Sequence, residues 1–380
     1  MRALRREFLL EPSITYLNHG SFGATPRAVF AVYQAWQREL ERQPVEFLDR
    51  RFAERMAVSR AILGEYLGTQ RDNLVYVTNA TVAVNIVARS LDLGPGDEVL
   101  ATDHEYGACD RAWRYLSHKR GFTYVNHPLS MPVLSAEAFV AQMWQAVNAS
   151  TRVIYLSHIT SPTALVLPVA AVCHRARDQG ILTLVDGAHA PGQLSLDLDA
   201  IGADFYAGNL HKWLCAPKGA GFLYARPEAQ ELLEPLVVSW GYQPEKPGPS
   251  RFIDHHEWWG TRDLAAFLSV PAAIQFQETN NWEDVREACH ALAVAAEERI
   301  CQCTGLPSLY SHDHWYLQMV SIALPESIEI NVLKARLYDD HRIEVPLFAW
   351  KGQKLIRVSF QGYNSRRDLN RLVAGLQSLL

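Results

Sequence analysis

The chain has 380 residues, of which 48% are hydrophobic and 20% charged, and its formal net charge is −5. This length predicts one large domain and one smaller one. The negative charge gives no electrostatic basis for nucleic-acid binding, and no apolar run approaches the roughly 20 residues of a membrane span. The basic N-terminus carries only a short apolar patch at Phe8–Leu10, so we expect a cytoplasmic protein rather than an exported one.

The cysteines and histidines do not predict a metal site. Six cysteines are scattered along the chain, and only Cys301 and Cys303 lie close together. A C-x-C pair alone is a poor metal signature, so we expect reduced, mostly buried thiols. The histidine pairs at 255–256 and 312/314 lack a matching carboxylate or helical spacing. We interpret them as solvated loop residues.

Helices are predicted near the N-terminus, after an extended segment and a glycine turn over residues 13–25. Thr25-Pro26 suits a helix start, with Thr25 as the cap and proline in the first turn. Apolar periodicity then predicts helices over Val29–Leu40 and Phe47–Leu67.

From Leu74 the pattern changes to an alternation of strands and helices. Helices are expected near residues 82–91, 108–120, 135–148 and 168–179. The predicted strands are Leu74–Thr78, Glu98–Thr102, Phe122–Asn126, Arg152–Ser157, Ile181–Val185, Asp204–Ala207 and Gly221–Ala225. Such alternation predicts an α/β fold with a mostly parallel, doubly wound sheet of seven strands flanked by helices.

The remaining chain predicts a smaller α+β domain. Residues 241–260 are rich in glycine, proline and aromatics and indicate a long irregular connection. A helical pattern runs from 264 to 299, followed by strands over 318–324 and 354–359 and helices over 331–341 and 366–380. We therefore predict a large domain over residues 20–275 and a small domain over 276–380, joined by residues 1–19.

The stretch Ile181–Lys212 carries the strongest chemical signal. Asp186 and His189 follow one predicted buried strand, and Asn209, His211 and Lys212 follow the next. The carboxyl ends of strands in α/β sheets are where ligands bind. Pyridoxal phosphate needs an acid that keeps its ring nitrogen protonated and a lysine that forms a Schiff base. An acid and a lysine at neighbouring strand ends indicate this cofactor.

Other strand ends carry weaker signals. Asn79, Ala80 and Thr81 open a predicted helix, where backbone N–H groups bind phosphate, although the same residues also suit a plain helix cap. His104 or Tyr106 could stack on a cofactor ring, or belong to an ordinary surface loop.

The segment Ser157–Pro168 follows another predicted strand. Ser161 and Thr163 in it are candidates for hydrogen bonds to the ring oxygen or the substrate. A structural Ser-Pro turn is the alternative.

Taken together, several motifs resemble the class V aminotransferase family of fold-type I pyridoxal-phosphate enzymes, and most of all its isopenicillin N epimerase-like branch. The motifs span roughly residues 15 to 365. They are YLNHGSFGATP, TNATVAVN, DHEYGA, HITSPTALVLP, VDGAHAPGQ, GNLHKWLCAPKGAGFLY, WWGTRD and LIRVSFQGYN.

The resemblance implies roles at the cofactor. Lys212 would be the Schiff-base lysine, Asp186 the partner of the pyridinium and His189 a contact of the ring hydroxyl. Tyr106 would stack on the ring. The phosphate would be held by residues at the helix start and after the second strand: Asn79, Ala80, Thr81, Asn209 and His211.

The resemblance also implies a homodimer with shared sites, because Gly260 and Thr261 would reach the phosphate of the neighbouring subunit. Arg357 would hold the substrate carboxylate, a task that suits a bidentate guanidinium. Asn18 and His19 are further candidates for substrate binding.

The sequence disfavours one reaction of this family but does not decide among the others. A persulfide-forming desulfurase needs a loop cysteine shortly before the carboxylate-binding arginine, and residues 341–354 contain none. We expect an epimerase or racemase acting at the α-carbon of an amino acid, with Tyr106, His104 or His19 as the second proton donor. A β-eliminating C–S lyase and an aminotransferase are alternatives, and a non-catalytic binding protein on the same scaffold is a remote one. A dinucleotide-dependent oxidoreductase is disfavoured because no G-x-G-x-x-G follows a strand.

Overall fold

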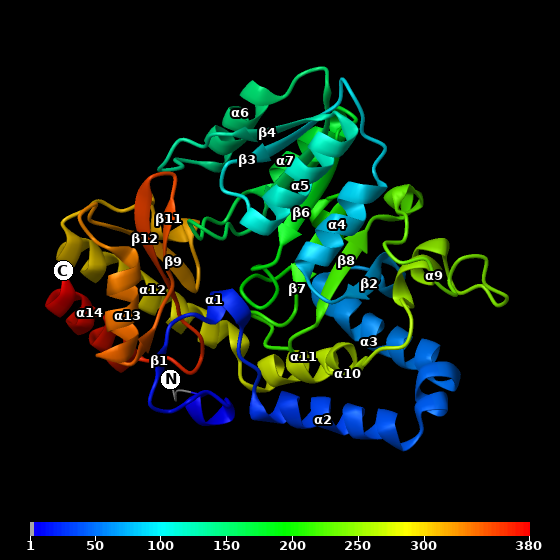
Figure 1. Ribbon diagram of the computed structural model, residues 1–380, viewed down its shortest axis with the longest axis horizontal. Helices are drawn as coiled ribbons and strands as arrows, with labels where there is room; N and C mark the ends of the chain where they lie inside the picture. Colours follow the sequence, from blue (N-terminus) through cyan, green and yellow to red (C-terminus); the bar gives the residue numbers. More distant parts are fainter. Residues whose placement is uncertain (1–3) are drawn as a thin grey trace.

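The computed structural model describes residues 4–380, and its centre is a seven-stranded sheet in the order β2-β8-β7-β6-β5-β3-β4 (Figure 1). Neighbouring strands run parallel except where β8 pairs antiparallel with β2 and β7. The mostly parallel sheet predicted from the sequence is thus confirmed. Its strands are β2 (Leu74–Val77), β3 (Glu98–Thr102), β4 (Thr123–His127), β5 (Thr151–Ser157), β6 (Leu182–Gly187), β7 (Phe205–Asn209) and β8 (Gly221–Ala225).

Both faces of this sheet are buried. Val153 and Tyr155 of β5 belong to one apolar cluster, whereas Ile154 and Leu156 belong to the cluster on the other face. Burial on both faces explains why the strands appear in the sequence as continuous apolar runs. The covering helices are α4 (Ala80–Ser90), α5 (Gly107–Arg120), α6 (Ala136–Ala146), α7 (Val169–Asp178) and α8 (Leu198–Ile201).

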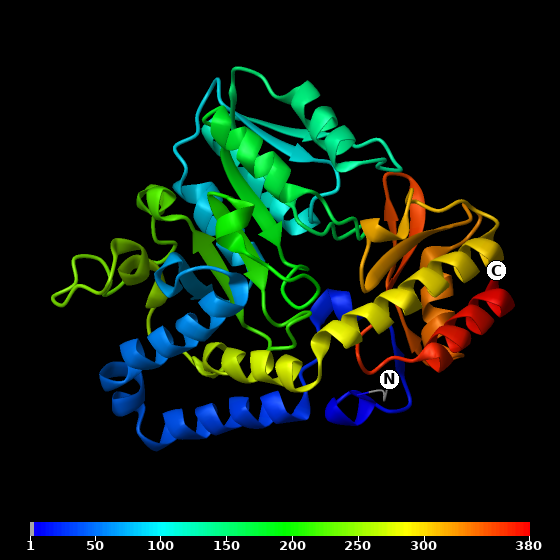
Figure 2. The same ribbon diagram turned by 180° about the vertical axis from the view of Figure 1, so that it is seen from behind.

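A second group of helices runs along the lower edge of the molecule in Figure 2. It comprises α2 (Arg27–Arg42), the short η2 (Glu46–Arg50), α3 (Phe52–Leu67), α10 (Ala265–Leu268), α11 (Val270–Thr279) and the start of α12 (Trp282–Thr304). The single helical run predicted from 264 to 299 is broken, because Asn281 adopts a left-handed φ of 48°.

Thr25 does not cap α2, which corrects the prediction. Pro26 occupies the N-cap position without a side-chain hydrogen bond. The Thr25 hydroxyl instead donates to the carbonyl of Ala216 at 3.2 Å. Thr25 therefore ties the helix start to the loop that follows Lys212.

The C-terminal part forms a three-stranded antiparallel sheet in the order β11-β12-β9, beside the large sheet (Figures 1 and 2). Its elements are β9 (Met319–Leu324), α13 (Ile330–Asp339), β11 (Leu347–Trp350), β12 (Gln353–Ser359) and α14 (Arg366–Leu379). The N-terminal segment joins it, since β1 (Thr15–Tyr16) pairs parallel with β10 (Ile343–Glu344). The domain boundary near residue 275 stays a prediction, and residues 1–3 of the predicted joining segment lie outside the described residues.

The connection over residues 241–260 is not wholly irregular, since it contains the helix α9 (Arg251–Glu257). Ser250 caps this helix by accepting from the Ile253 N–H at 3.2 Å. His256 is completely buried, so the interpretation of the 255–256 pair as solvated loop histidines is wrong. Phe252, Ile253 and His256 face inward together because they are one residue and one helical turn apart.

Several shorter elements complete the fold. They are η1 (Leu4–Glu7), α1 (His19–Phe22), η3 (Arg71–Asn73), η4 (Pro227–Leu232) and η5 (Asp313–Trp315).

Among residues 4–380, no helix is both long enough and apolar enough to cross a membrane.

Candidate active site

Asp186 lies at the carboxyl end of β6, buried in the middle of the sheet. Its Oδ1 accepts from the Ala188 N–H at 2.9 Å, and its Oδ2 accepts from the Tyr155 hydroxyl at 3.2 Å. The Cys109 thiol approaches the same oxygen at 3.7 Å. Burial raises the pKa of Asp186, while the Ala188 N–H and nearby Lys212 oppose that rise. The hydrogen bonds from Ala188 and Tyr155 fix the orientation of the Asp186 carboxylate.

Lys212 lies in the turn after β7, and β7 is the neighbour of β6. Its Nζ is 3.1 Å from Nε2 of His189, and Nδ1 of His189 accepts from the Trp213 indole at 3.1 Å. Burial, helped by the charge of Arg357, lowers the pKa of Lys212 to about 8. A substantial fraction of this amine is therefore neutral near physiological pH.

The N-terminus of α4 lies next to the end of β7. Asn79 caps the helix by accepting from the Val82 N–H at 3.0 Å, and the Ala80 N–H donates to the side chain of Asn209 at 2.9 Å. Thr81 occupies the first helical turn, where N–H groups lack acceptors within the helix. His211 Nδ1 donates to the Ala220 carbonyl at 3.1 Å. The residues predicted to hold a phosphate thus lie in adjacent segments.

The loop between β3 and α5 carries Tyr106 and His104 in different environments. Tyr106 precedes α5 and is 45% exposed. His104 is fully buried, with Nδ1 2.7 Å from the hydroxyl of Thr163 and its ring 4.4 Å from that of Trp350. Tyr106 is therefore the accessible side chain of the two.

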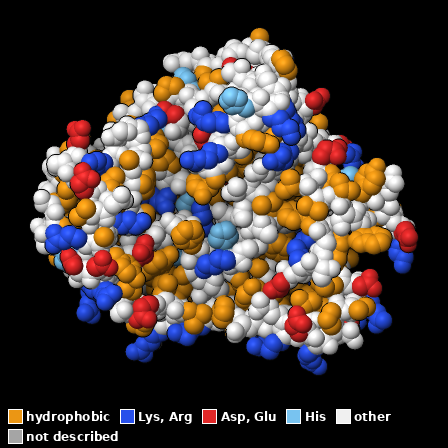
Figure 3. Space-filling view, viewed as in Figure 1, with side chains coloured by type: hydrophobic (Ala, Val, Ile, Leu, Met, Phe, Trp, Pro, Cys, Tyr) orange, Lys and Arg blue, Asp and Glu red, His pale blue; other side chains and the backbone are white. Residues whose placement is uncertain are grey.

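Arg357 is a buried arginine on β12 that reaches from the small sheet toward the site. Its Nη1 donates to the carbonyl and hydroxyl of Ser161 at 2.6 and 3.0 Å, and its Nη2 donates to Ser21 at 3.1 Å. Its Nε has no acceptor within residues 4–380. The Ser21 hydroxyl donates in turn to Asn18 at 2.5 Å. Lys or Arg and His side chains gather in a hollow near the middle of this face (Figure 3).

His19 is engaged through both ring nitrogens. Nε2 donates to the backbone carbonyl of Lys212 at 3.0 Å, and Nδ1 accepts from the Tyr363 hydroxyl at 2.9 Å. Burial lowers the pKa of His19 to about 3, so its imidazole stays neutral. This arrangement suits support of the lysine backbone better than proton donation to a substrate.

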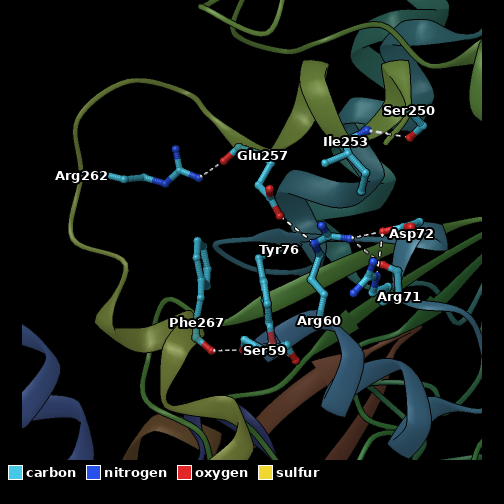
Figure 4. Close-up of polar contacts among 10 residues, drawn as sticks. All are labelled: Ser59, Arg60, Arg71, Asp72, Tyr76, Ser250, Ile253, Glu257, Arg262 and Phe267. Atoms are coloured by element: carbon cyan, nitrogen blue, oxygen red, sulfur yellow. Dashed lines mark hydrogen bonds and ion pairs between the residues drawn. The ribbon is translucent and has the colours of Figure 1, made fainter. Parts of the chain in front are cut away.

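Gly260 and Thr261 lie apart from this group, in the connection after α9. No hydrogen bond recorded among residues 4–380 links them to Lys212 or Asp186. Figure 4 shows how their segment is fixed: buried Arg60 pairs with Glu257 at 2.7 Å and with Asp72 at 2.9 Å. Arg262 donates to the Glu257 carbonyl at 2.7 Å. Gly260 and Thr261 therefore lie between two residues that are held in place, Glu257 and Arg262.

Sequence reasoning missed four residues that contact the predicted group: Tyr155 and Cys109 on Asp186, Trp213 on His189, and Ser21 on Arg357. Glu105 was also missed. It is buried between the hydroxyls of Thr102 at 2.5 Å and Ser157 at 2.6 Å, and burial raises its pKa to about 8. Trp213, Ser21 and Glu105 lie in motifs quoted from the sequence, whereas Tyr155 and Cys109 lie outside them.

These residues fit pyridoxal phosphate. A buried acid and a partly buried amine of lowered pKa lie at neighbouring strand ends, and the N-terminus of helix α4 lies beside them. No cluster that could hold a metal ion occurs in the part of the chain that the structure describes. Fold and site together define a fold-type I pyridoxal-phosphate enzyme.

Comparison with known proteins agrees. The Aminotransferase class-V profile matches residues 16–372, so the chain belongs to that family. It is similar to isopenicillin N epimerase of Amycolatopsis lactamdurans, with 37% identity, and of Streptomyces clavuligerus, with 35%; each match covers 99% of this chain and 97% of the relative.

Similarity extends to enzymes of sulfur metabolism. A probable chloroplastic L-cysteine desulfhydrase of Arabidopsis thaliana is 28% identical over 97% of this chain and 84% of that protein. A solved structure of C-DES, with glycine covalently linked to its pyridoxal-phosphate cofactor, superposes with a TM-score of 0.82. It has 25% identity and covers 98% of both chains.

Proposed function

We propose that this enzyme is an amino-acid epimerase of the isopenicillin N epimerase type, acting at the α-carbon of its substrate. The observation that carries the proposal is the meeting of Lys212, His189 and Asp186 at two neighbouring strand ends, in a chain whose 35–37% identical relatives are epimerases. Bound pyridoxal phosphate supplies a sink for the electron pair left when a bond at the α-carbon breaks.

Different side chains of this protein would then carry out different parts of the reaction. Lys212, with a pKa of about 8, is the base that accepts the α-proton. Asp186 holds the cofactor's ring nitrogen, and Arg357 holds the substrate carboxylate through its buried guanidinium. Tyr106 is the accessible phenol on the loop after β3, and we assign it the second proton transfer.

A β-eliminating C–S lyase is the second candidate. Cysteine desulfhydrase relatives and C-DES, which is described as a cystine C–S lyase, favour it. Such a reaction begins with the same loss of the α-proton, so Lys212 would serve both. The two reactions differ in the next step, which is either return of a proton to the α-carbon or loss of a group at the β-carbon.

The deciding experiment compares wild type with Lys212→Ala, each mixed with pyridoxal phosphate. Lys218→Ala is the control, since Lys218 is an exposed lysine only six residues further on. We expect a visible absorption band for wild type and Lys218→Ala that is absent from Lys212→Ala. Each protein is then incubated in D₂O with isopenicillin N and with a panel of L-amino acids that includes L-cysteine.

Deuterium at the α-carbon together with both configurations of the product would support the epimerase. Keto acid and a freed leaving group, with the configuration of the remaining substrate intact, would move the assignment to the lyase. Absence of the absorption band from wild type would remove the role of Lys212.

We further propose a homodimer in which Gly260 and Thr261 serve the neighbouring subunit's site. Support comes from a surface groove of about 980 Å³ lined by Trp240, Trp258 and Thr261, and from the 82% exposure of Trp240. Aromatic side chains are enriched where proteins associate. Sedimentation equilibrium would then give twice the chain mass, and a monomer at all concentrations would refute the dimer.

The cytoplasmic location stays a prediction.

A further inference from the structure

Trp213 directly follows the reactive lysine and its side chain is completely buried. Its indole N–H points at Nδ1 of His189 at 3.1 Å. An indole nitrogen can only donate, so Nδ1 of His189 must accept and carries no proton. A neutral imidazole then bears its single proton on Nε2. The indole therefore selects one of the two neutral tautomers of His189.

The selected tautomer constrains Lys212. Nε2 of His189 is 3.1 Å from Nζ of Lys212, and with its proton in place Nε2 can only donate. Nζ must accept through a lone pair, which an amine has and an ammonium group lacks. The hydrogen bond between the two side chains therefore exists only while Lys212 is neutral.

The charges near His189 all lower its pKa, whereas those near Lys212 act on its pKa in both directions. Arg357 opposes a proton on Lys212, whereas Asp186 and Cys109 favour one. Burial lowers the pKa of His189 well below its usual value, and Lys212 and Arg357 beside it lower that pKa further. His189 therefore stays neutral, and its contact with Lys212 is one of several influences on that amine.

We propose that Trp213 is a positioning residue that fixes the tautomer of His189 and thereby favours the neutral amine of Lys212. The inference rests on the proposed role of Lys212 as the reactive amine. When Lys212 accepts a proton it loses the hydrogen bond from His189, so the same contact favours release of that proton. The Nε2–H is also the donor available to a ring hydroxyl of the cofactor.

A merely structural role for Trp213 must be separated from this one. Its ring packs 5.0 Å from that of His19, among Ile159, Ala164 and Met319. Trp282 provides the matched control: it is buried, and its indole N–H donates over the same 3.1 Å, but to the backbone carbonyl of Gly192. Replacing either tryptophan with phenylalanine removes one buried indole hydrogen bond.

The first measurement needs no variant of the tryptophan. Nitrogen-15 NMR of the cofactor-free wild type, with His189 assigned by its absence from His189→Gln, reports which ring nitrogen carries the proton. We expect the Nε2–H tautomer at pH 7 to 8. A proton on Nδ1, or on both nitrogens, would overturn the proposal.

The second measurement follows the visible absorption that appears when cofactor-free protein is mixed with pyridoxal phosphate, as a function of pH. The rate depends on the neutral fraction of Lys212, so the wild-type midpoint is expected near pH 8. Loss of one hydrogen bond predicts a midpoint about one pH unit higher for Trp213→Phe. Trp282→Phe should keep the wild-type midpoint, and an unshifted Trp213→Phe would contradict the inference.

A pair of variants at His189 tests the same point with Trp213 intact. Glutamine offers one acceptor for the indole and one donor for Lys212, so His189→Gln should keep the midpoint near that of wild type. Leucine offers neither, so His189→Leu should raise it; equal midpoints for the two would refute the mechanism. None of these measurements contains an amino-acid substrate, so failure of the epimerase assignment would leave them unchanged.

Discussion

His256 is a single residue whose burial has a measurable consequence. Within residues 4–380 neither ring nitrogen has a hydrogen-bond partner, and its ring packs 5.3 Å from Phe252. Burial, followed by the charges of His255 and Arg251, lowers the pKa of His256 to about 4. An unfolded histidine titrates near 6.5, so below that pH the unfolded chain binds more protons than the folded one. This group therefore makes the protein less stable as the pH falls from 6.5 to 4.

We predict that His256→Phe stabilises the fold, and more so in acid. Removal of an unpartnered buried imidazole should contribute about 1–3 kcal/mol at pH 8. At pH 5 the protonation of the unfolded wild type adds about 2 kcal/mol to that difference. Thermal denaturation of both proteins at the two pH values checks this, with the exposed His312→Phe as control. An equal difference at pH 5 and pH 8 would show that His256 does not titrate as described.

At the scale of elements, the hairpin of β11 and β12 bridges the two sheets. Its turn places Lys351 and Gly352 in left-handed conformations, with φ of 48° and 78°. The Lys351 ammonium pairs with Asp103 and lies over the Trp350 ring, which in turn packs against His104. The hairpin tip therefore contacts the loop that carries Tyr106.

We predict that Lys351→Ala raises KM several-fold while changing the free energy of unfolding by less than about 1 kcal/mol. A partly exposed ion pair contributes little to stability. The same hairpin carries Arg357, so a loosened tip should weaken the binding of the substrate carboxylate that we propose for this arginine. Lys354→Ala is the control, since Lys354 binds the carbonyls of Glu326 and Ile328 instead. An unchanged KM in Lys351→Ala would show that the tip does not position Arg357.

The sequence predicted the elements with strong periodicity and missed those defined by tertiary contacts. The strands of the large sheet were found because both of their faces are apolar. The short strands β10 and β11 and the helix α1 are too brief to show a period, whereas β1 lies in the stretch 13–25 that was predicted to open with an extended segment. Helix α9 was hidden by the glycine and proline around it, although Ser250 is an ordinary cap.

The same distinction holds for the site. Lys212, Asp186 and His189 could be grouped from the sequence because parallel strands end at one edge of a sheet. The contact of His19 with Lys212 joins residues 193 positions apart, so no local sequence pattern predicts it. Tyr155 reaches Asp186 from the strand beside it, which depends on a strand order that alternation alone does not give.

For the whole molecule, the proposed dimer makes a prediction that a single subunit cannot satisfy. If Thr261 serves the partner's site, a mixture of Lys212→Ala and Thr261→Trp subunits forms some dimers with one intact site. Activity should then reappear on co-refolding of two proteins that are each inactive, up to about a quarter of wild type, because half of random dimers are mixed and each has one working site of two. No recovery, although mixed dimers are detected, would place Thr261 outside the site.

The hydrogen bonds of His19 join three segments that lie far apart in the sequence. His19 donates to the Lys212 carbonyl and accepts from the Tyr363 hydroxyl, so this network joins segments that are 344 positions apart and are synthesised at different times. The large sheet is complete at β8, long before Arg357 and Tyr363 are made. When the large sheet is first complete, Lys212 therefore lacks both Arg357 and a His19 ring that is held by Tyr363. The proposed site is complete only after Tyr363 has been added to the chain and has reached His19.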